Sequence, residues 1–144
     1  MSVPVISPIQ VDKIFIIDSS FHIESEPAPN MNLHFDVRCN TLSESLDGED
    51  GQMEIELTVE CHLSDAEDES IVKMTAGTTV YAAASSPLPK ELDQEERREY
   101  MLSNLIALTY SHAKSHIMSI TALSPMNALI LPAILPSEMV KTKE

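Results

Sequence analysis

Glycine and aromatic residues are scarce in this sequence of 144 residues, which has three glycines, three tyrosines, three phenylalanines and no tryptophan. Enzymes that use nucleotides commonly hold the phosphates in a glycine-rich loop, and many hydrolases place their nucleophile in a G-x-S-x-G turn. The three glycines are scattered and form neither motif. The sequence therefore argues against a nucleotide-dependent or serine-dependent enzyme, and we expect a non-enzymatic protein that needs no cofactor.

Basic residues are also few, with 9 lysines and arginines against 23 aspartates and glutamates, so the formal net charge is -14. Phosphate backbones and anionic lipid surfaces would repel such a chain. No apolar run approaches the ~20 residues needed to span a bilayer. The opening MSVPVISPIQ lacks the basic and apolar regions of a secretory signal. We therefore expect a cytoplasmic protein that neither binds nucleic acid nor inserts into membranes.

The spacing of apolar residues changes once along the chain. In the first part of the chain apolar and polar residues alternate, which predicts strands at about 9–24, 31–42, 52–64 and 70–84. From about 91 to 123 apolar residues recur every three or four positions without glycine or proline, which predicts one long helix. The apolar, proline-rich stretch that follows, 126–140, predicts a short helix or tail. The length fits a single domain over residues 1–144.

The expected strands differ in how cleanly they alternate. In the first strand the apolar residues of one parity are Ile9, Val11, Phe15, Ile17, Phe21 and Ile23. Ile14 and Ile16 are apolar residues of the other parity, so we expect this strand to be partly covered on both faces. The second and third strands alternate strictly and predict a long hairpin. Gly77 interrupts the fourth strand and indicates a bulge or a close backbone approach.

The spacing of the two cysteines, Cys39 and Cys61, bears on the redox compartment. If Leu42 and Gln52 close the hairpin, Cys39 faces Ile55 and Cys61 lies six residues further along. At ~3.3 Å per residue the thiols are then ~20 Å apart, which is far beyond the reach of a disulfide. Reduced thiols again favour the cytoplasm.

Three local sequences carry a resemblance to the SecB-like protein-export chaperone family. VDKIFIIDSSF (11–21) resembles that family's first strand, in which a basic residue, an isoleucine and an aromatic residue precede an Asp. SHAKSHIMSITALS (111–124) resembles its long helix, with an Ala-Arg/Lys pair that is here Ala113 and Lys114. LPAIL (131–135) resembles the apolar stretch that opens its last helix. The order of the elements matches the family along nearly the whole chain.

The resemblance implies an α+β fold, a four-stranded antiparallel sheet with the long C-terminal helix packed on one face and a short apolar, proline-rich second helix or tail. It implies an ATP-independent holdase that binds unfolded polypeptide clients in protein export and assembles as a homotetramer, a dimer of dimers. It also implies docking of the translocation ATPase SecA on the exposed sheet surface. There Asp18 matches an acidic position, whereas His22 and Lys73 replace acidic residues. A SecB-like chaperone for another client, such as an antitoxin, is the alternative.

Apolar residues of the second expected strand and of the tail form the candidate client groove. Leu33, Phe35 and Val37 share one strand parity, and the tail is apolar without a long helix in which to bury itself. The predicted groove residues are Leu33, Phe35, Val37, Met126, Leu129, Leu131, Ile134 and Leu135. Burial of such side chains against an extended client needs little sequence specificity.

The long helix has more apolar surface than one sheet face requires. Leu102, Ile106 and Ala113 mark the stripe that we expect to face the sheet. The resemblance places an interface between dimers on the surplus, for which the predicted residues are Tyr110, Lys114, Ile117 and Met118. An architectural subunit that assembles through the helix and tail without clients is a further hypothesis.

His112 and His116 raise the alternative of a small metal-dependent enzyme. They stand at i and i+4 on the helix, a spacing that lets two imidazoles meet one zinc ion. No glutamate follows His112 as in H-E-x-x-H, so two partly buried, hydrogen-bonded histidines without metal are the preferred interpretation. The acidic turn at 43–51 likewise lacks the ligand spacing of a calcium loop.

Overall fold

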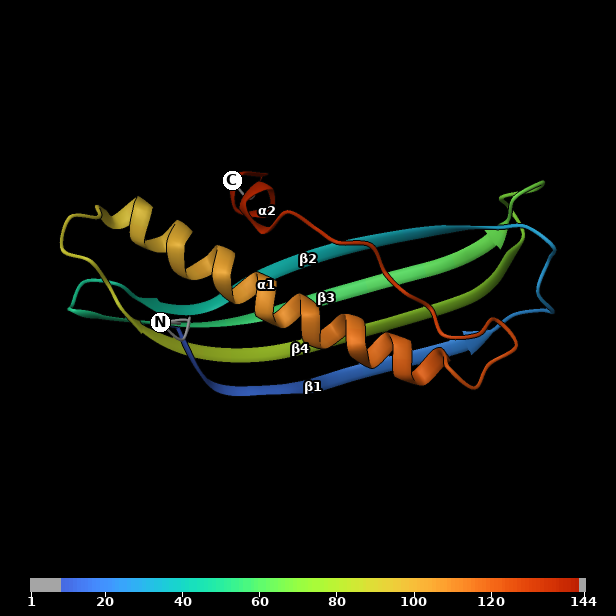
Figure 1. Ribbon diagram of the computed structural model, residues 1–144, viewed down its shortest axis with the longest axis horizontal. Helices are drawn as coiled ribbons and strands as arrows, with labels where there is room; N and C mark the ends of the chain where they lie inside the picture. The colour runs from blue at the N-terminus through green and yellow to red at the C-terminus, as the bar shows by residue number, and fades with distance from the viewer. Residues whose placement is uncertain (1–8, 143–144) are drawn as a thin grey trace, which may run out of the picture.

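The computed structural model describes residues 9–142. The elements in chain order are β1 (Gln10–Ile23), β2 (Met31–Ser45), β3 (Asp50–Asp65), β4 (Val72–Pro87), α1 (Gln94–Thr121) and α2 (Pro136–Thr142). The strands form one antiparallel sheet in the order β1-β4-β3-β2, so β1 and β2 are its edges. α1 lies across one face of the sheet, and α2 packs on α1 (Figure 1). The predicted sheet, long helix and short second helix are confirmed.

β3 and β4 supply the sheet's share of the core because every second residue of both strands is apolar or small. The carboxylates of β3, at Glu54, Glu56 and Glu60, lie on the opposite face. The buried side chains of the two strands include Met53, Ile55, Leu57, Val59, Cys61, Leu63, Met74, Ala76, Val80, Ala82 and Ala84. The sheet thus has an apolar face under α1, here called the helix side, and a polar outer face.

Two β-bulges change the direction of side chains in β1. Its pairing with β4 shifts at residues 11–13 and again at 16–18. Each extra residue moves the side chains that follow it to the other face of the sheet. Ile14 and Ile16 therefore pack against the core on the helix side, whereas Phe15 is exposed on the outer face. The apolar residues of one parity between Ile9 and Ile23 therefore do not all lie on one face of the sheet.

The β2–β3 hairpin is longer than the sequence pattern predicts. Gln52 pairs with Ser45 and not with Leu42, and a bulge between Thr41 and Ser43 shifts the register. The expected closing pair is therefore wrong, and the cross-strand partners differ by two or three positions from those expected.

The corrected register brings the two cysteines closer than expected. Cys39 faces Leu57, and Cys61 faces Phe35, so they lie four residues apart along the strand pair, or ~13 Å. Neither of these two cysteines forms a disulfide. Burial raises the pKa of the Cys61 thiol to about 11, so this thiol is neutral and weakly reactive near neutral pH.

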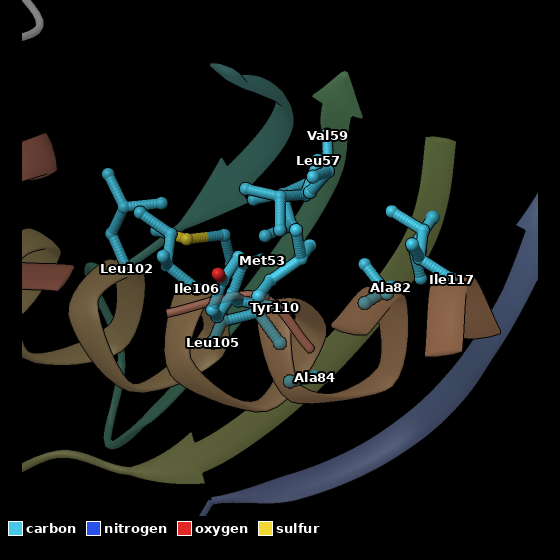
Figure 2. Close-up of a cluster of buried hydrophobic side chains, with 14 of the residues drawn as sticks. Met53, Leu57, Val59, Ala82, Ala84, Leu102, Leu105, Ile106, Tyr110 and Ile117 are labelled. Carbon is cyan, nitrogen blue, oxygen red and sulfur yellow. The ribbon is translucent and has the colours of Figure 1, made fainter. Parts of the chain in front are cut away.

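α1 begins with a capping box. The Asp93 carboxylate accepts from the backbone N–H of Glu96 at 2.8 Å, and the Glu96 carboxylate accepts from the N–H of Asp93 at 3.1 Å, which satisfies donors that a helix start leaves open. Figure 2 shows part of the core between the sheet and α1, formed by Met53, Leu57, Val59, Ala82, Ala84, Leu102, Leu105, Ile106, Tyr110 and Ile117. In the part of the chain that the structure describes, neither helix has the length and apolar character needed to span a bilayer.

Arg97, in the first turn of α1, ties two loops to the helix. Its guanidinium donates to the carbonyl oxygens of Leu46 at 2.9 Å and Gly48 at 2.8 Å, both in the β2–β3 turn. It also donates to those of Pro89 at 3.3 Å and Leu92 at 3.1 Å, in the linker before α1. The planar fork of arginine donors suits several acceptors at once. One half-buried cation therefore holds turn, linker and helix in one arrangement.

Candidate functional site

The helix side of β2 lies beyond the cover of α1. α1 packs on β4 and β3 and reaches β1, the opposite edge of the sheet, but makes at most marginal contact with β2. The β2 side chains of Leu33, Phe35 and Val37 point to the helix side and are partly buried against the core. The three predicted groove residues of this strand therefore form one row on an edge strand.

After α1 the chain turns back and runs beside the helix toward α2 without forming helix or strand (Figure 1). We call residues 122–135 the return segment. The backbone N–H of Leu129 donates to Thr121 Oγ1 at 2.8 Å, and the Tyr110 hydroxyl donates to the carbonyl oxygen of Pro132. These two hydrogen bonds fix the return segment to α1 through its backbone.

The apolar side chains of the return segment differ widely in burial. Leu131 is 1% exposed and Met126 is 9% exposed, so both belong to the core. Leu129 and Ile134 are partly buried against it, and Leu135 is 69% exposed. Of the five predicted groove residues of the tail, two are thus already enclosed by the chain itself. Their contact with a client stays a prediction.

Two of the four residues predicted for an interface between dimers belong to the core of the monomer. Tyr110 and Ile117 are buried because they continue the stripe that contains Ala113 at spacings of three and four residues. The expectation that Ile117 faces away from the sheet is therefore wrong. Lys114 is half-buried and Met118 is 40% exposed, so these two stay available for a self-contact.

The exposed face of α1 carries few charges. Between Tyr100 and Ser124 the chain has no acidic residue and one lysine, Lys114, although the whole chain has a net charge of -14. Two large apolar side chains of this helix, Leu108 and Met118, are each 40% exposed. This face of α1 therefore lacks the negative charge that most of the chain carries.

The outer face of the sheet has a hollow of about 420 Å³ around Gly77. The glycine allows Ser20 of β1 to approach closely, because a Cβ atom at Gly77 would lie 3.2 Å from Ser20 Oγ. Carboxylates of Asp18, Asp36 and Glu60 line the hollow. The sequence pattern did not reveal it, and the glycine inside a strand was the one signal that pointed to a close approach there.

Histidines gather at one end of this hollow. The rings of His34 and His62, on neighbouring strands, are stacked with their centroids 4.7 Å apart, and His34 Nε2 lies 3.6 Å from Glu69 Oε1. His62 is opposite Thr75, which is in turn opposite His22 on β1. Three histidines therefore share one row across the sheet. The outer face is less acidic here than the resemblance implies.

His112 and His116 do not converge on a metal site. His116 Nε2 shares a hydrogen bond of 2.7 Å with Ser19 Oγ of β1, and His112 is exposed. Within residues 9–142, no group of three His, Cys, Asp or Glu side chains could hold a metal ion. The contact that His116 makes joins the end of α1 to the edge strand β1.

A four-stranded antiparallel sheet with a long helix on one face and a short helix after it is the fold that the resemblance to SecB-like chaperones implies. The solved structure of the Mycobacterium tuberculosis SecB-like chaperone Rv1957, in complex with a ChAD peptide from the Rv1956 HigA1 antitoxin, is similar to this chain. Its TM-score is 0.61 at 13% identity, over 88% of this chain and 91% of that chain. This likeness shows that the chain has a SecB-like fold.

A protein of unknown function from Streptococcus agalactiae is also similar, with a TM-score of 0.49 at 12% identity, over 87% of this chain and 97% of that chain. No protein-family model and no curated protein matches the sequence.

Proposed function

We propose that this protein is an ATP-independent chaperone that holds unfolded polypeptide segments against the helix side of β2. The observation that carries the proposal is the row of Leu33, Phe35 and Val37, whose partly buried side chains lie on an edge strand beyond the cover of α1. Rv1957, which shares the fold, is a chaperone in complex with a peptide. We extend that role, polypeptide binding without catalysis, to this chain.

A single row of apolar side chains gives weak binding. Full burial of a leucine, valine or phenylalanine contributes roughly 1.5–3 kcal/mol, so three such side chains contribute at most about 9 kcal/mol, and less where they are already partly buried. Association costs an estimated 4–15 kcal/mol in lost freedom of motion. Little net affinity is left for one row. An oligomer that presents several rows to one long client would gain the missing affinity by avidity.

We therefore propose a homo-oligomer, the dimer of dimers that the resemblance implies, with contacts through the exposed face of α1. Leu108 and Met118 supply apolar area on that face, and the lack of carboxylates there removes repulsion between copies. Tyr110 and Ile117 support the interface only indirectly, by holding α1 on its own sheet.

Protein export in the cytoplasm is the setting we propose, with a dedicated client as the alternative. Export would use docking of SecA on the outer face, where Asp18, Asp36 and Glu60 line the hollow. His22 and Lys73 reduce the negative charge of that face. A dedicated client, such as an antitoxin of the kind seen with Rv1957, needs no outer-face partner. Sedimentation of a mixture with purified SecA separates the two settings, because only export requires a complex.

Suppression of the aggregation of a chemically denatured protein, followed by light scattering without ATP, tests the holding activity. Phe35→Asn should weaken suppression several-fold because Phe35 belongs to the row on the helix side. Phe15→Asn is the matched control, since Phe15 lies on the other edge strand and on the outer face, so suppression should be unchanged. A wild-type protein that suppresses no aggregation would refute the chaperone role and favour the architectural subunit.

A further inference from the structure

Part of the return segment has the properties expected of a bound client. Residues 126–135 form neither helix nor strand, are rich in apolar side chains and lie against the core. Intervening side chains such as Ile130, which is 68% exposed, point away from it. The side chains that pack inward are those of Met126, Leu129, Leu131 and Ile134. The chain thus packs an extended apolar segment of its own on the side of the sheet where we place clients.

We propose that residues 126–135 occupy part of the polypeptide-binding site and that clients compete with them for it. This inference rests on the proposed chaperone function and adds its regulation and its preferred ligand. The fitting client is an extended segment with apolar side chains at positions i, i+3, i+5 and i+8, the pattern with which the chain fills the site itself.

The way α1 holds this segment allows another polypeptide to take its place. Thr121 accepts from a backbone N–H, that of Leu129, and Tyr110 donates to a backbone carbonyl, that of Pro132. Both bonds involve only main-chain atoms of the segment, and every polypeptide carries such atoms. A client could therefore form the same two bonds whatever its sequence, while its apolar side chains replace the inward-facing ones.

Competition also gives a reason for the near-complete burial of Leu131. An open apolar site would leave an exposed, aggregation-prone apolar patch on the client-free protein. The segment covers that site with a ligand that can never diffuse away, so only clients with enough apolar contacts displace it. The barrier set by this competitor would make the site selective for segments that are long and strongly apolar.

Leu131→Ala tests the competition, because it removes the most deeply buried side chain of the segment and leaves the Thr121 and Tyr110 hydroxyls free to bind a client. The variant should bind a urea-denatured, fluorescently labelled client about fivefold more tightly than wild type in anisotropy titrations, since the competitor loses apolar contacts that the client supplies with its own side chains. Ile130→Ala is the matched control, because Ile130 lies in the same segment but is 68% exposed, so its loss leaves the segment in place. Unchanged or weaker binding by Leu131→Ala would overturn the proposal.

A second experiment separates this inference from the chaperone role. In one variant, residues 126–135 are replaced by glycine and serine at equal length, and a labelled peptide of residues 124–136 is added. Binding of the peptide to this variant and not to wild type supports a displaceable segment, even for a protein that suppresses no aggregation. Absence of peptide binding, together with no gain in Leu131→Ala, would discard the inference and leave any holding activity of the wild type unaffected.

Discussion

Removal of Arg97 should loosen three parts of the fold at once. The guanidinium makes part-buried hydrogen bonds to the carbonyl oxygens of Leu46 and Leu92. Its bonds to Gly48 and Pro89 are exposed, so water can replace them. A hydrogen bond to a charged group contributes roughly 1.5–3 kcal/mol, and solvent screening lowers that value. For the part-buried pair we therefore expect Arg97→Ala to lower the free energy of unfolding by about 3 kcal/mol, or the Tm by roughly 10 °C.

Urea denaturation followed by circular dichroism measures this loss, at two protein concentrations because self-association also stabilises the fold. Arg98→Ala is the matched control. Arg98 Nε lies 3.3 Å from a carboxylate oxygen of Glu44, in a surface ion pair whose side chains are 30% and 39% exposed, and solvent-screened surface pairs contribute about 0–1 kcal/mol. Arg97→Lys should resemble Arg97→Ala because an ammonium group cannot reproduce the arginine fork. Equal losses for Arg97→Ala and Arg98→Ala would refute the anchoring role.

Burial raises the pKa of Cys61 to about 11, so its thiolate fraction near pH 8 is about a hundredfold below that of an ordinary cysteine. Iodoacetamide should therefore leave Cys61 unmodified in the folded protein and alkylate it in urea, as mass spectrometry of the digest would show. A hydrogen bond from Ser43 holds the pKa of Glu54 below 4.5, so the ionised carboxylate stabilises the fold above that pH and ceases to do so as the pH falls through the lowered pKa. The difference in stability between wild type and Glu54→Gln should thus shrink from about pH 6 to about pH 3, and a constant difference would contradict this. Replacing both Leu108 and Met118 by glutamate should reduce the particle mass in light scattering and leave circular dichroism unchanged, whereas an unchanged mass excludes this face of α1 as the interface.

Much of the fold could be predicted because the burial of regular elements has a fixed period. The alternation in β2, β3 and β4 and the helical spacing of α1 give each element within a few residues. The register could not be predicted, because the bulge after Thr41 and those in β1 each add one residue, and no sequence pattern signals them. The hairpin closes at Ser45 and not at Leu42, and the bulge then shifts every later partner by one residue, so that Cys39 faces Leu57 and not Ile55.

The candidate site could be predicted only where strand parity defines it. The row on β2 follows from alternation alone. The enclosure of Leu131 depends on a segment that folds back onto α1, a contact between parts of the chain that no local pattern encodes. The sequence pattern assigned Ile117 to the wrong face of α1 for a different reason. Ile117 and Met118 are adjacent and equally apolar, yet the helix turns by about 100° per residue, so one is buried and the other exposed.

The order of the strands also decides when the chain can complete its sheet during synthesis. β2, β3 and β4 follow one another and pair as neighbours, so they can assemble as soon as they leave the ribosome. β1 is made first, but its partner is β4, as in the pairing of Ile16 with Val80. Pairing between segments so distant in sequence is slow compared with hairpin closure. A nascent chain therefore carries the apolar side of its oldest strand, with Ile14 and Ile16, uncovered until three further strands have been translated.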